Sequence, residues 1–343
     1  MRKQIAKMLS MLLTAAMLFS LTACNSGKPS KEEGAKAPET VTVLDANNKE
    51  VTIRTNPKRV AILEPSALDI LDAAGMDKTG IEKLGVQQTE SCLPNYLSQY
   101  MDDEYVNVGS LFEADYDTLD LLDPELIIYG NRFGAHDENE GESLGKLKER
   151  YPNADLLFYQ VEGDTFGADI KRNCETLAAI FPQTKDEITK QVKEIEDSFA
   201  KISETVKGND TLFLMIGGGY ITFYGPVGRY AMAHNEFGFT PADTKTEVTS
   251  HHGAEVNAEY VMTENPKVIL LLDHDSAIGE GATSSAKKDF LNNTMIQKTD
   301  AYKNGDIYEL DPAAWYINPG GLTSTKQMIS DLMPYVEKLE KTK

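Results

Sequence analysis

The sequence predicts an α/β protein with two lobes, each built on a central, largely parallel sheet, and one long helix that joins them. Two observations support this prediction. In both halves of the chain, short apolar runs alternate with amphipathic segments, which is typical of βαβ units whose parallel strands are buried on both faces. Between the halves lies one long amphipathic segment, residues 184–207.

The joining helix is predicted from the spacing of its apolar side chains. They recur at alternating intervals of four and three residues, which places them on one helical face: Ile188, Val192, Ile195, Phe199, Ile202 and Val206. Thr184 and Glu187 match a capping box at the start, and Gly208 follows the last apolar residue. A helix over residues 184–207 reaches roughly 35 Å. We therefore expect a stiff strut that holds the lobes at a nearly fixed separation and limits closure on ligand binding.

The first 23 residues predict a targeting segment, because three basic residues precede an apolar stretch at residues 8–21. The following Leu21-Thr22-Ala23-Cys24 resembles a bacterial lipobox, in which Cys24 is diacylated and becomes the mature N-terminus. The alternative is an ordinary secretory signal in which Cys24 is incidental. Residues 24–40 are poor in apolar side chains and predict a flexible tether. No later stretch is apolar for long enough to span a bilayer, so we expect an extracytoplasmic protein anchored to the cell membrane by its lipid.

The N-terminal lobe, residues 41–183, begins with an alternating stretch around Asn47 and Asn48 that predicts a β-hairpin. Apolar runs predict buried strands at residues 60–63, 126–129 and 156–159. Helical periodicity predicts helices at residues 66–74, 116–122, 142–150 and 168–180.

The C-terminal lobe, residues 208–343, repeats this arrangement. A hairpin is predicted at residues 212–216 and 220–224, with the glycines 217–219 in its turn. Further strands are predicted at residues 268–272 and 307–310, and helices at residues 230–237, 285–292 and 326–339.

Charge and motif content exclude several functions. The chain carries 34 Lys and Arg against 54 Asp and Glu, a formal net charge of −20, which argues against a nucleic-acid partner. An anionic ligand must therefore be bound by a local basic site. The sequence contains no nucleophile elbow, P-loop, H-E-x-x-H or paired C-x-x-C motif, so catalysis is not predicted. Cys92 and Cys174 remain after the signal, and their spacing does not decide whether they pair.

Two polar stretches lie near the ends of predicted strands, where open α/β sheets place their ligands. One contains His251 and His252, and the other contains Trp315 and Tyr316 after the strand at residues 307–310. Neutral imidazole and tyrosine phenolate are both suitable ligands for ferric iron. Alone, each residue is explained as well by a loop histidine or an amphipathic rim tyrosine. Their combination is therefore more informative than either one.

Short sequence motifs in both lobes, in the same order along the chain, match a known family. They include Asn56-Pro57-Lys58-Arg59-Val60, Val108-Gly109-Ser110-Leu111-Phe112-Glu113, Tyr224-Gly225-Pro226-Val227-Gly228-Arg229-Tyr230, Glu236-Phe237-Gly238-Phe239 and Trp315-Tyr316. With these phrases the mature chain resembles the class III substrate-binding lipoproteins of ABC importers, specifically the binders of ferric catecholate siderophores such as petrobactin. The resemblance implies a two-lobe class III fold without an intrinsic cofactor. It also implies that a ferric siderophore is held between the lobes and delivered to the transmembrane subunits of a permease.

The resemblance assigns roles by motif. His252 and Tyr316 correspond to residues that complete the coordination of the iron. Arg132 and Arg229 correspond to two of three arginines around the anionic catecholates, a task that suits the planar, always-charged guanidinium. Where the family has its third arginine this chain has His274, so the ligand is expected to carry less charge or not to be a catecholate.

Neighbouring residues have further assignments, and other functions stay open. Trp315 is expected beside the ligand, and His251 is an alternative to His252 as the iron ligand. His136 and His234 are expected to be structural or surface residues. Glu113 is a candidate contact to basic pockets of the permease, and a monomer is expected. The alternatives are the same fold binding haem, a corrinoid or another metal chelate, and an exported metal-dependent enzyme built on the histidine pair.

Overall fold

The computed structural model describes residues 40–89, 93–139, 141–246, 248, 251–279 and 284–342. Residues 37–343 form one compact unit that contains both lobes. The predicted signal peptide, Cys24, almost all of the tether, and Cys92 lie outside the described residues. Cys174 is described and fully buried. Because Cys92 lies outside the described residues, whether the two cysteines pair stays open. None of the helices in the described ranges has the length and apolar character needed to cross a bilayer.

The N-terminal lobe is organised around a parallel sheet with the strand order β5-β4-β3-β6-β7. The strands are β3 (Arg59–Leu63), β4 (Lys83–Val86), β5 (Val106–Asn107), β6 (Leu126–Tyr129) and β7 (Asp155–Phe158). The side chains of β3 alternate between two buried clusters, with Val60 and Ile62 on one face and Ala61 and Leu63 on the other. Both faces are therefore covered, as a continuous apolar run predicts. The sequence does not predict β4 and β5, because Lys83 and Gly85 interrupt the apolar run of β4 and β5 has only two residues.

Helices cover both faces of this sheet. α1 (Pro65–Gly75) and α4 (Phe166–Ile180) share a buried cluster with Val60, whereas α2 (Tyr116–Leu122) and α3 (Glu142–Arg150) share the other cluster. The bounds of α2 and α3 are those predicted. The predicted hairpin is also confirmed, because β1 (Thr40–Leu44) pairs antiparallel with β2 (Glu50–Arg54). Asn48 makes the turn with a left-handed φ of 58°.

The C-terminal sheet has the order β11-β9-β8-β12-β13 and is mixed. Its strands are β8 (Asp210–Gly217), β9 (Tyr220–Tyr224), β10 (Thr240–Pro241, paired with β8), β11 (Ala254–Val256), β12 (Val268–Asp273) and β13 (Ile307–Leu310). Its helices are α6 (Met232–Asn235), α7 (Ala258–Glu264), α8 (His274–Ala277), α9 (Ala286–Asn292), α10 (Asp300–Asn304) and α11 (Leu322–Thr342). β8, β12 and β13 form the predicted parallel core, and β9 and β11 add an antiparallel edge.

Helix α5 (Lys185–Val206) lies within one residue of its predicted ends and buries most of the predicted apolar stripe. The predicted capping box is wrong. The Thr184 hydroxyl donates instead to the carbonyl of Phe181 at 2.8 Å, and Glu187 accepts a hydrogen bond from within the helix. A short 3₁₀ turn, Pro182–Thr184, leads directly into α5, so Thr184 already has helical backbone angles. A capping box requires an extended residue at that position.

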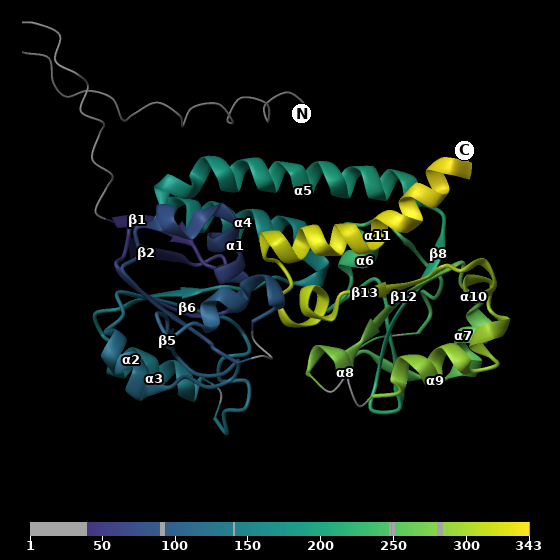
Figure 1. Ribbon diagram of the computed structural model, residues 1–343, viewed down its shortest axis with the longest axis horizontal. Coiled ribbons are helices and arrows are strands. Elements are labelled where there is room, and N and C mark those ends of the chain that lie inside the picture. The colour runs from purple at the N-terminus through teal and green to yellow at the C-terminus, as the bar shows by residue number, and fades with distance from the viewer. Residues whose placement is uncertain are drawn as a thin grey trace, which may run out of the picture. The chain divides into compact units, whose positions relative to one another are not determined.

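A second helix, α11, also braces the lobes. Figure 1 shows it lying beside α5, and it packs against both α5 and α1. The carboxylate of Asp69 on α1 accepts hydrogen bonds from the backbone N–H groups of Thr323 and Ser324, at 2.8 and 2.9 Å. The chain passes from one lobe to the other at α5, as the sequence predicts. Two helices, α5 and α11, nevertheless hold the lobes together, so the structure adds a second strut to the predicted one.

The segment that leads into α11 is held by the N-terminal lobe as well. Ser66 donates a hydrogen bond to the carbonyl of Pro319 at 3.0 Å, and Tyr159 donates one to the carbonyl of Gly320 at 2.9 Å. A Cβ at Gly321 would lie 2.0 Å from the carboxylate on α1, so only glycine fits there. The N-terminal lobe therefore sets the path of this segment of the C-terminal lobe.

Replacing Asp69 by alanine should lower the free energy of unfolding by roughly 3 kcal/mol, because it leaves buried N–H groups at the start of α11 without an acceptor. Urea unfolding followed by circular dichroism measures this change. Asp103→Ala, which removes an exposed carboxylate, is the control and should change the stability little. Equal stability of the two variants would show that the Asp69 contact does not hold α11.

Candidate ligand-binding site

A cavity of about 820 Å³ is lined by residues of both lobes. Its volume is in the range of small-molecule sites. On the N-terminal side the lining residues Glu64, Arg132 and Tyr159 follow β3, β6 and β7. On the C-terminal side Arg229 follows β9 and Tyr316 follows β13. The cavity thus lies at the carboxyl ends of strands, where α/β sheets bind their ligands.

Two arginines flank Tyr316. The guanidinium carbon of Arg229 lies 4.3 Å from the centre of the Tyr316 ring, and that of Arg132 lies 5.8 Å from it. Arg132 comes from the N-terminal lobe and donates hydrogen bonds to the backbone carbonyls of Tyr316 and Ile317, the latter at 2.7 Å. The structure thus brings together, from both lobes, three of the residues that the sequence predicts around a ligand.

Arg229 stays charged in this environment. Its guanidinium also lies 5.3 Å from the centre of the Tyr230 ring. Burial disfavours the cation, but Tyr230, Tyr316 and Tyr224 outweigh burial and raise the pKa of Arg229. The cavity therefore contains a permanent positive charge beside aromatic faces, which suits a planar anionic ligand.

Trp315 lies in a single π-helical turn between β13 and α11. Its side chain is fully buried, its indole nitrogen donates to Asp331 at 2.9 Å, and its ring packs against Phe213 and Phe237. The next residue, Tyr316, is only partly buried and lines the cavity. Trp315 is also among the residues that line the cavity, but its side chain is fully buried, so a contact with a ligand stays a prediction.

His274, the first residue of α8, contacts Tyr316 directly. Its Nε2 lies 3.1 Å from the Tyr316 hydroxyl, and the two rings meet edge to face with their centres 4.9 Å apart. Its Nδ1 lies 3.9 Å from the carboxylate of Asp275. At the position where the resemblance leads us to expect a third arginine, the chain therefore has a residue that positions the tyrosine hydroxyl.

His251 and His252 both line the cavity, with their ring centres 6.1 Å apart. The backbone of His252 is held by the Tyr224 hydroxyl, which donates to its carbonyl at 3.0 Å. Burial lowers the pKa of His251, and the positive charges of Arg229 and Arg132 lower it further. The geometry therefore leaves both histidines as candidate iron ligands. Within the described ranges, no group of three or more His, Cys, Asp or Glu side chains is arranged to hold a metal ion.

The two remaining histidines differ in their position relative to the cavity. His234 is buried on α6 with its Nδ1 3.0 Å from the carbonyl of Phe239, and burial lowers its pKa, as for a structural residue. His136, which the sequence also assigns to structure or surface, lines the cavity and stands 4.5 Å from the ring of Phe112. The sequence could have placed His136 at the cavity, because it lies in the same loop after β6 as Arg132.

Two charged residues of the cavity lining are missed by the sequence reasoning, Glu64 and Glu162. Glu64 caps α1 by accepting from the backbone N–H of Ser66 at 3.3 Å. Burial raises the pKa of Glu64, against the opposing influence of Arg132 and Ser66. Both glutamates follow the ends of predicted strands. The rule that open α/β sheets place ligands at strand ends, which selected Tyr316, therefore applies to them as well.

Comparison with known proteins adds the family context. The model of a family described as periplasmic binding protein matches residues 60–314. Petrobactin-binding protein YclQ of Bacillus subtilis is 33% identical over 98% of this chain and 100% of its own length. Ferric-anguibactin-binding protein FatB of Vibrio anguillarum is 25% identical over 94% of this chain and 95% of its own length.

Solved structures share the fold of both lobes. The crystal structure of the periplasmic catecholate-siderophore binding protein VctP of Vibrio cholerae matches with a TM-score of 0.75 at 28% identity, covering 86% of this chain and 100% of that chain. The crystal structure of YclQ also matches with a TM-score of 0.75, at 31% identity, covering 88% of this chain and 99% of that chain. The likeness therefore extends across the cavity and its two walls.

In an NMR titration of the imidazole resonances, His251 should titrate below the ordinary histidine pKa of about 6.5, because burial and then Arg229 disfavour the imidazolium. Arg229→Gln should raise the pKa of His251 towards that value. Arg150→Gln, which removes a charge on α3, is the control and should leave it unchanged. The direction matters because a lowered pKa keeps the ring neutral, and able to bind a metal, near pH 7. A His251 pKa above the ordinary value in the wild type would contradict this geometry.

Proposed function

Because this chain belongs to the periplasmic binding protein family, we propose that it is the extracytoplasmic solute-binding protein of an ABC importer and that it captures a ferric siderophore of the catecholate type. One observation carries the proposal: two arginines and a tyrosine converge in a cavity shared by both lobes, beside two histidines. An anionic iron chelate calls for this combination of permanent positive charge and hard donor atoms. The ligands named for the relatives, petrobactin, ferric anguibactin and a catecholate siderophore, support it.

In this proposal the siderophore supplies most of the iron ligands, and the protein fills or approaches the remaining positions. Tyr316 offers a phenolate oxygen, and His252 or its neighbour offers a ring nitrogen. Arg229 donates to the catecholate oxygens, since its guanidinium fork can serve two oxygens at once. Arg132, whose terminal nitrogens already donate to the carbonyls of Tyr316 and Ile317, adds its positive charge. His274 positions the Tyr316 hydroxyl and, standing in place of a third arginine, leaves the cavity with less positive charge.

Capture needs only a small change of shape. Arg132 already bridges the lobes, and α5 and α11 brace them, so movement around the ligand is local. Release then takes place to the transmembrane subunits of the permease. The relatives named above are binding proteins, and the proposal includes no chemical transformation.

The location of the protein is inferred from its N-terminal sequence. A lipid on Cys24 would hold the binding unit at the outer face of the cell membrane, with the following residues as a tether. There the unit, as a monomer, meets the permease. This part of the proposal depends on the lipobox, because Cys24 lies outside the described residues.

A fluorescence titration tests the ligand class. Adding a ferric catecholate should quench Trp315, the only tryptophan of the chain, because a coloured chelate bound beside Tyr316 accepts its excitation. Arg229→Gln should weaken binding about 10–100-fold, since a hydrogen bond to a charged group contributes about 1.5–3 kcal/mol. Arg150→Gln, which changes an exposed arginine outside the cavity, should bind like the wild type.

The same titration separates the alternatives. Tight binding of haem or a corrinoid, with no quenching by ferric catecholates, would assign the site to the other ligand class. The visible absorbance of the bound chelate tests the iron ligands, because Tyr316→Phe and His252→Ala should each shift its charge-transfer band. An unchanged spectrum in both variants would mean that neither residue coordinates the iron.

Replacing Cys24 by serine tests the anchor. In an expressing bacterium the wild-type protein should fractionate with membranes and enter the detergent phase, because its lipid is buried in the bilayer. Cys24→Ser removes the acylated thiol and should leave the protein in the aqueous phase. A serine variant that still enters the detergent phase would refute the lipid anchor.

A further inference from the structure

The cavity is lined by acidic as well as basic side chains. Besides Arg132 and Arg229, two glutamates of the N-terminal lobe line it, Glu64 after β3 and Glu162 after β7. Among the described lining residues, two carboxyl groups therefore stand beside two guanidinium groups. In its ionised form each carboxyl group would repel a purely anionic chelate.

Glu64 has one carboxylate oxygen without a partner. The residue is only 9% exposed, and its Oε1 accepts a hydrogen bond from the backbone N–H of Ser66 at 3.3 Å and lies 3.0 Å from the Ser66 hydroxyl oxygen. In the described part of the chain, no group donates a hydrogen bond to its Oε2. Gly130 makes room for this oxygen, because a Cβ at that position would lie 2.0 Å from it. Glu64 is thus a buried residue of the cavity lining with one unused acceptor oxygen.

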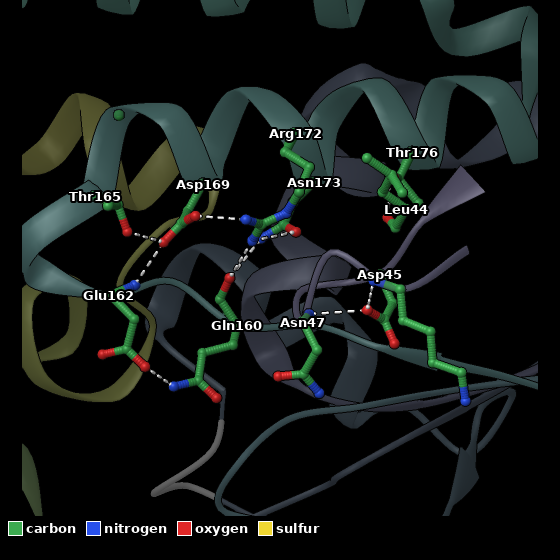
Figure 2. A network of polar contacts seen from close by, with 12 residues as sticks. Leu44, Asp45, Asn47, Gln160, Glu162, Thr165, Asp169, Arg172, Asn173 and Thr176 are labelled. Carbon is green, nitrogen blue, oxygen red and sulfur yellow. Dashed lines mark hydrogen bonds and ion pairs between the residues drawn. The ribbon is translucent and has the colours of Figure 1, made fainter. Parts of the chain in front are cut away.

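Glu162 lies exposed at the edge of the same cavity. Its carboxylate accepts a hydrogen bond from the side chain of Gln160, and Figure 2 shows these two side chains turned towards each other and away from α4. The arginine on α4, Arg172, is occupied by the carboxylate of Asp169 at 2.6 Å. Within the described ranges neither Glu162 nor Glu64 has a cation at ion-pair distance.

Arg132 does not neutralise Glu64 by contact. Its terminal nitrogens donate to the backbone carbonyls of Tyr316 and Ile317 in the other lobe, so its charge acts on the carboxylate only from a distance. A carboxylate that is removed from water without a paired cation carries an energetic cost. A ligand that brings a cation to this wall of the cavity would remove that cost.

We propose that Glu64 and Glu162 form a subsite for a protonated amine in the organic scaffold of the ferric chelate, whose iron-binding end meets Arg229 and Tyr316. The proposal rests on the proposed function. An alkylammonium group carries N–H donors that match carboxylate acceptors in charge and geometry. A chelate without the amine leaves both carboxylates unpaired in the complex, which is how polar sites reject close analogues. His274 fits this view, because an ammonium in the ligand lowers the anionic charge that a third arginine would otherwise neutralise.

Two synthetic chelates test the subsite. Both are ferric bis-catecholates with the same linker, which carries a secondary amine in one and the acetylated, neutral amide in the other. The wild-type protein should bind the amine about 10–100-fold more tightly than the amide in the tryptophan quenching assay. Glu64→Gln and Glu162→Gln should each reduce this ratio towards one, because the amine chelate loses a carboxylate partner while the amide chelate binds no more weakly than to the wild type.

The variants are matched to the structure. Glutamine at position 64 keeps the acceptor for Ser66, and the side chain of Glu162 is exposed, so both variants are expected to fold, which circular dichroism checks. Glu204→Gln removes the same charge from the exposed face of α5 and should keep the wild-type ratio. Equal affinities of the wild type for both chelates, or an unchanged ratio in both cavity variants, would overturn the subsite alone. Binding of neither chelate would overturn the proposed function and the subsite with it.

Discussion

The carboxylate of Asp69 is the contact on which the arrangement of the two lobes depends. It is fully buried on α1 and accepts the N–H groups of Thr323 and Ser324, so the N-terminal lobe caps a helix that continues into the other lobe. A helix start has unpaired N–H groups and partial positive charge, and a carboxylate satisfies both. Because the segment just before this helix carries Tyr316, the same contact sets the candidate iron ligand relative to the N-terminal wall of the cavity.

Local charge, rather than the charge of the whole chain, determines what the cavity can bind. The chain has a formal net charge of −20, yet the guanidinium groups of Arg229 and Arg132 both lie close to the ring of Tyr316. Both guanidinium groups are held in place, one against aromatic rings and the other by backbone carbonyls of the opposite lobe. Glu64 and Glu162 add acidic side chains to the same cavity lining. A lining with side chains of both kinds favours ligands that carry both charges over uniformly charged ones.

Much of the fold was predictable because burial against one face repeats with the geometry of the element. The four-and-three spacing located α5, and continuous apolar runs located β3, β6 and β12. The strands β4 and β5 were not predicted, since β4 contains a lysine and a glycine in place of a continuous apolar run and β5 has only two residues. The capping box at Thr184 failed because a preceding turn, which no spacing rule contains, had already set the backbone angles there.

For the site, the sequence by itself determined the candidate residues, because motifs and strand ends mark Arg132, Arg229, the histidine pair 251–252 and Tyr316 as chemically suited neighbours of a metal chelate. Only the tertiary structure decided which groups meet. It buried the Trp315 ring, placed His274 against the Tyr316 hydroxyl, and made Glu64 part of the cavity lining. The physical reason is that local spacing records which face of its own element a residue occupies. The distance between two elements is set by packing contacts between residues that are far apart in the chain.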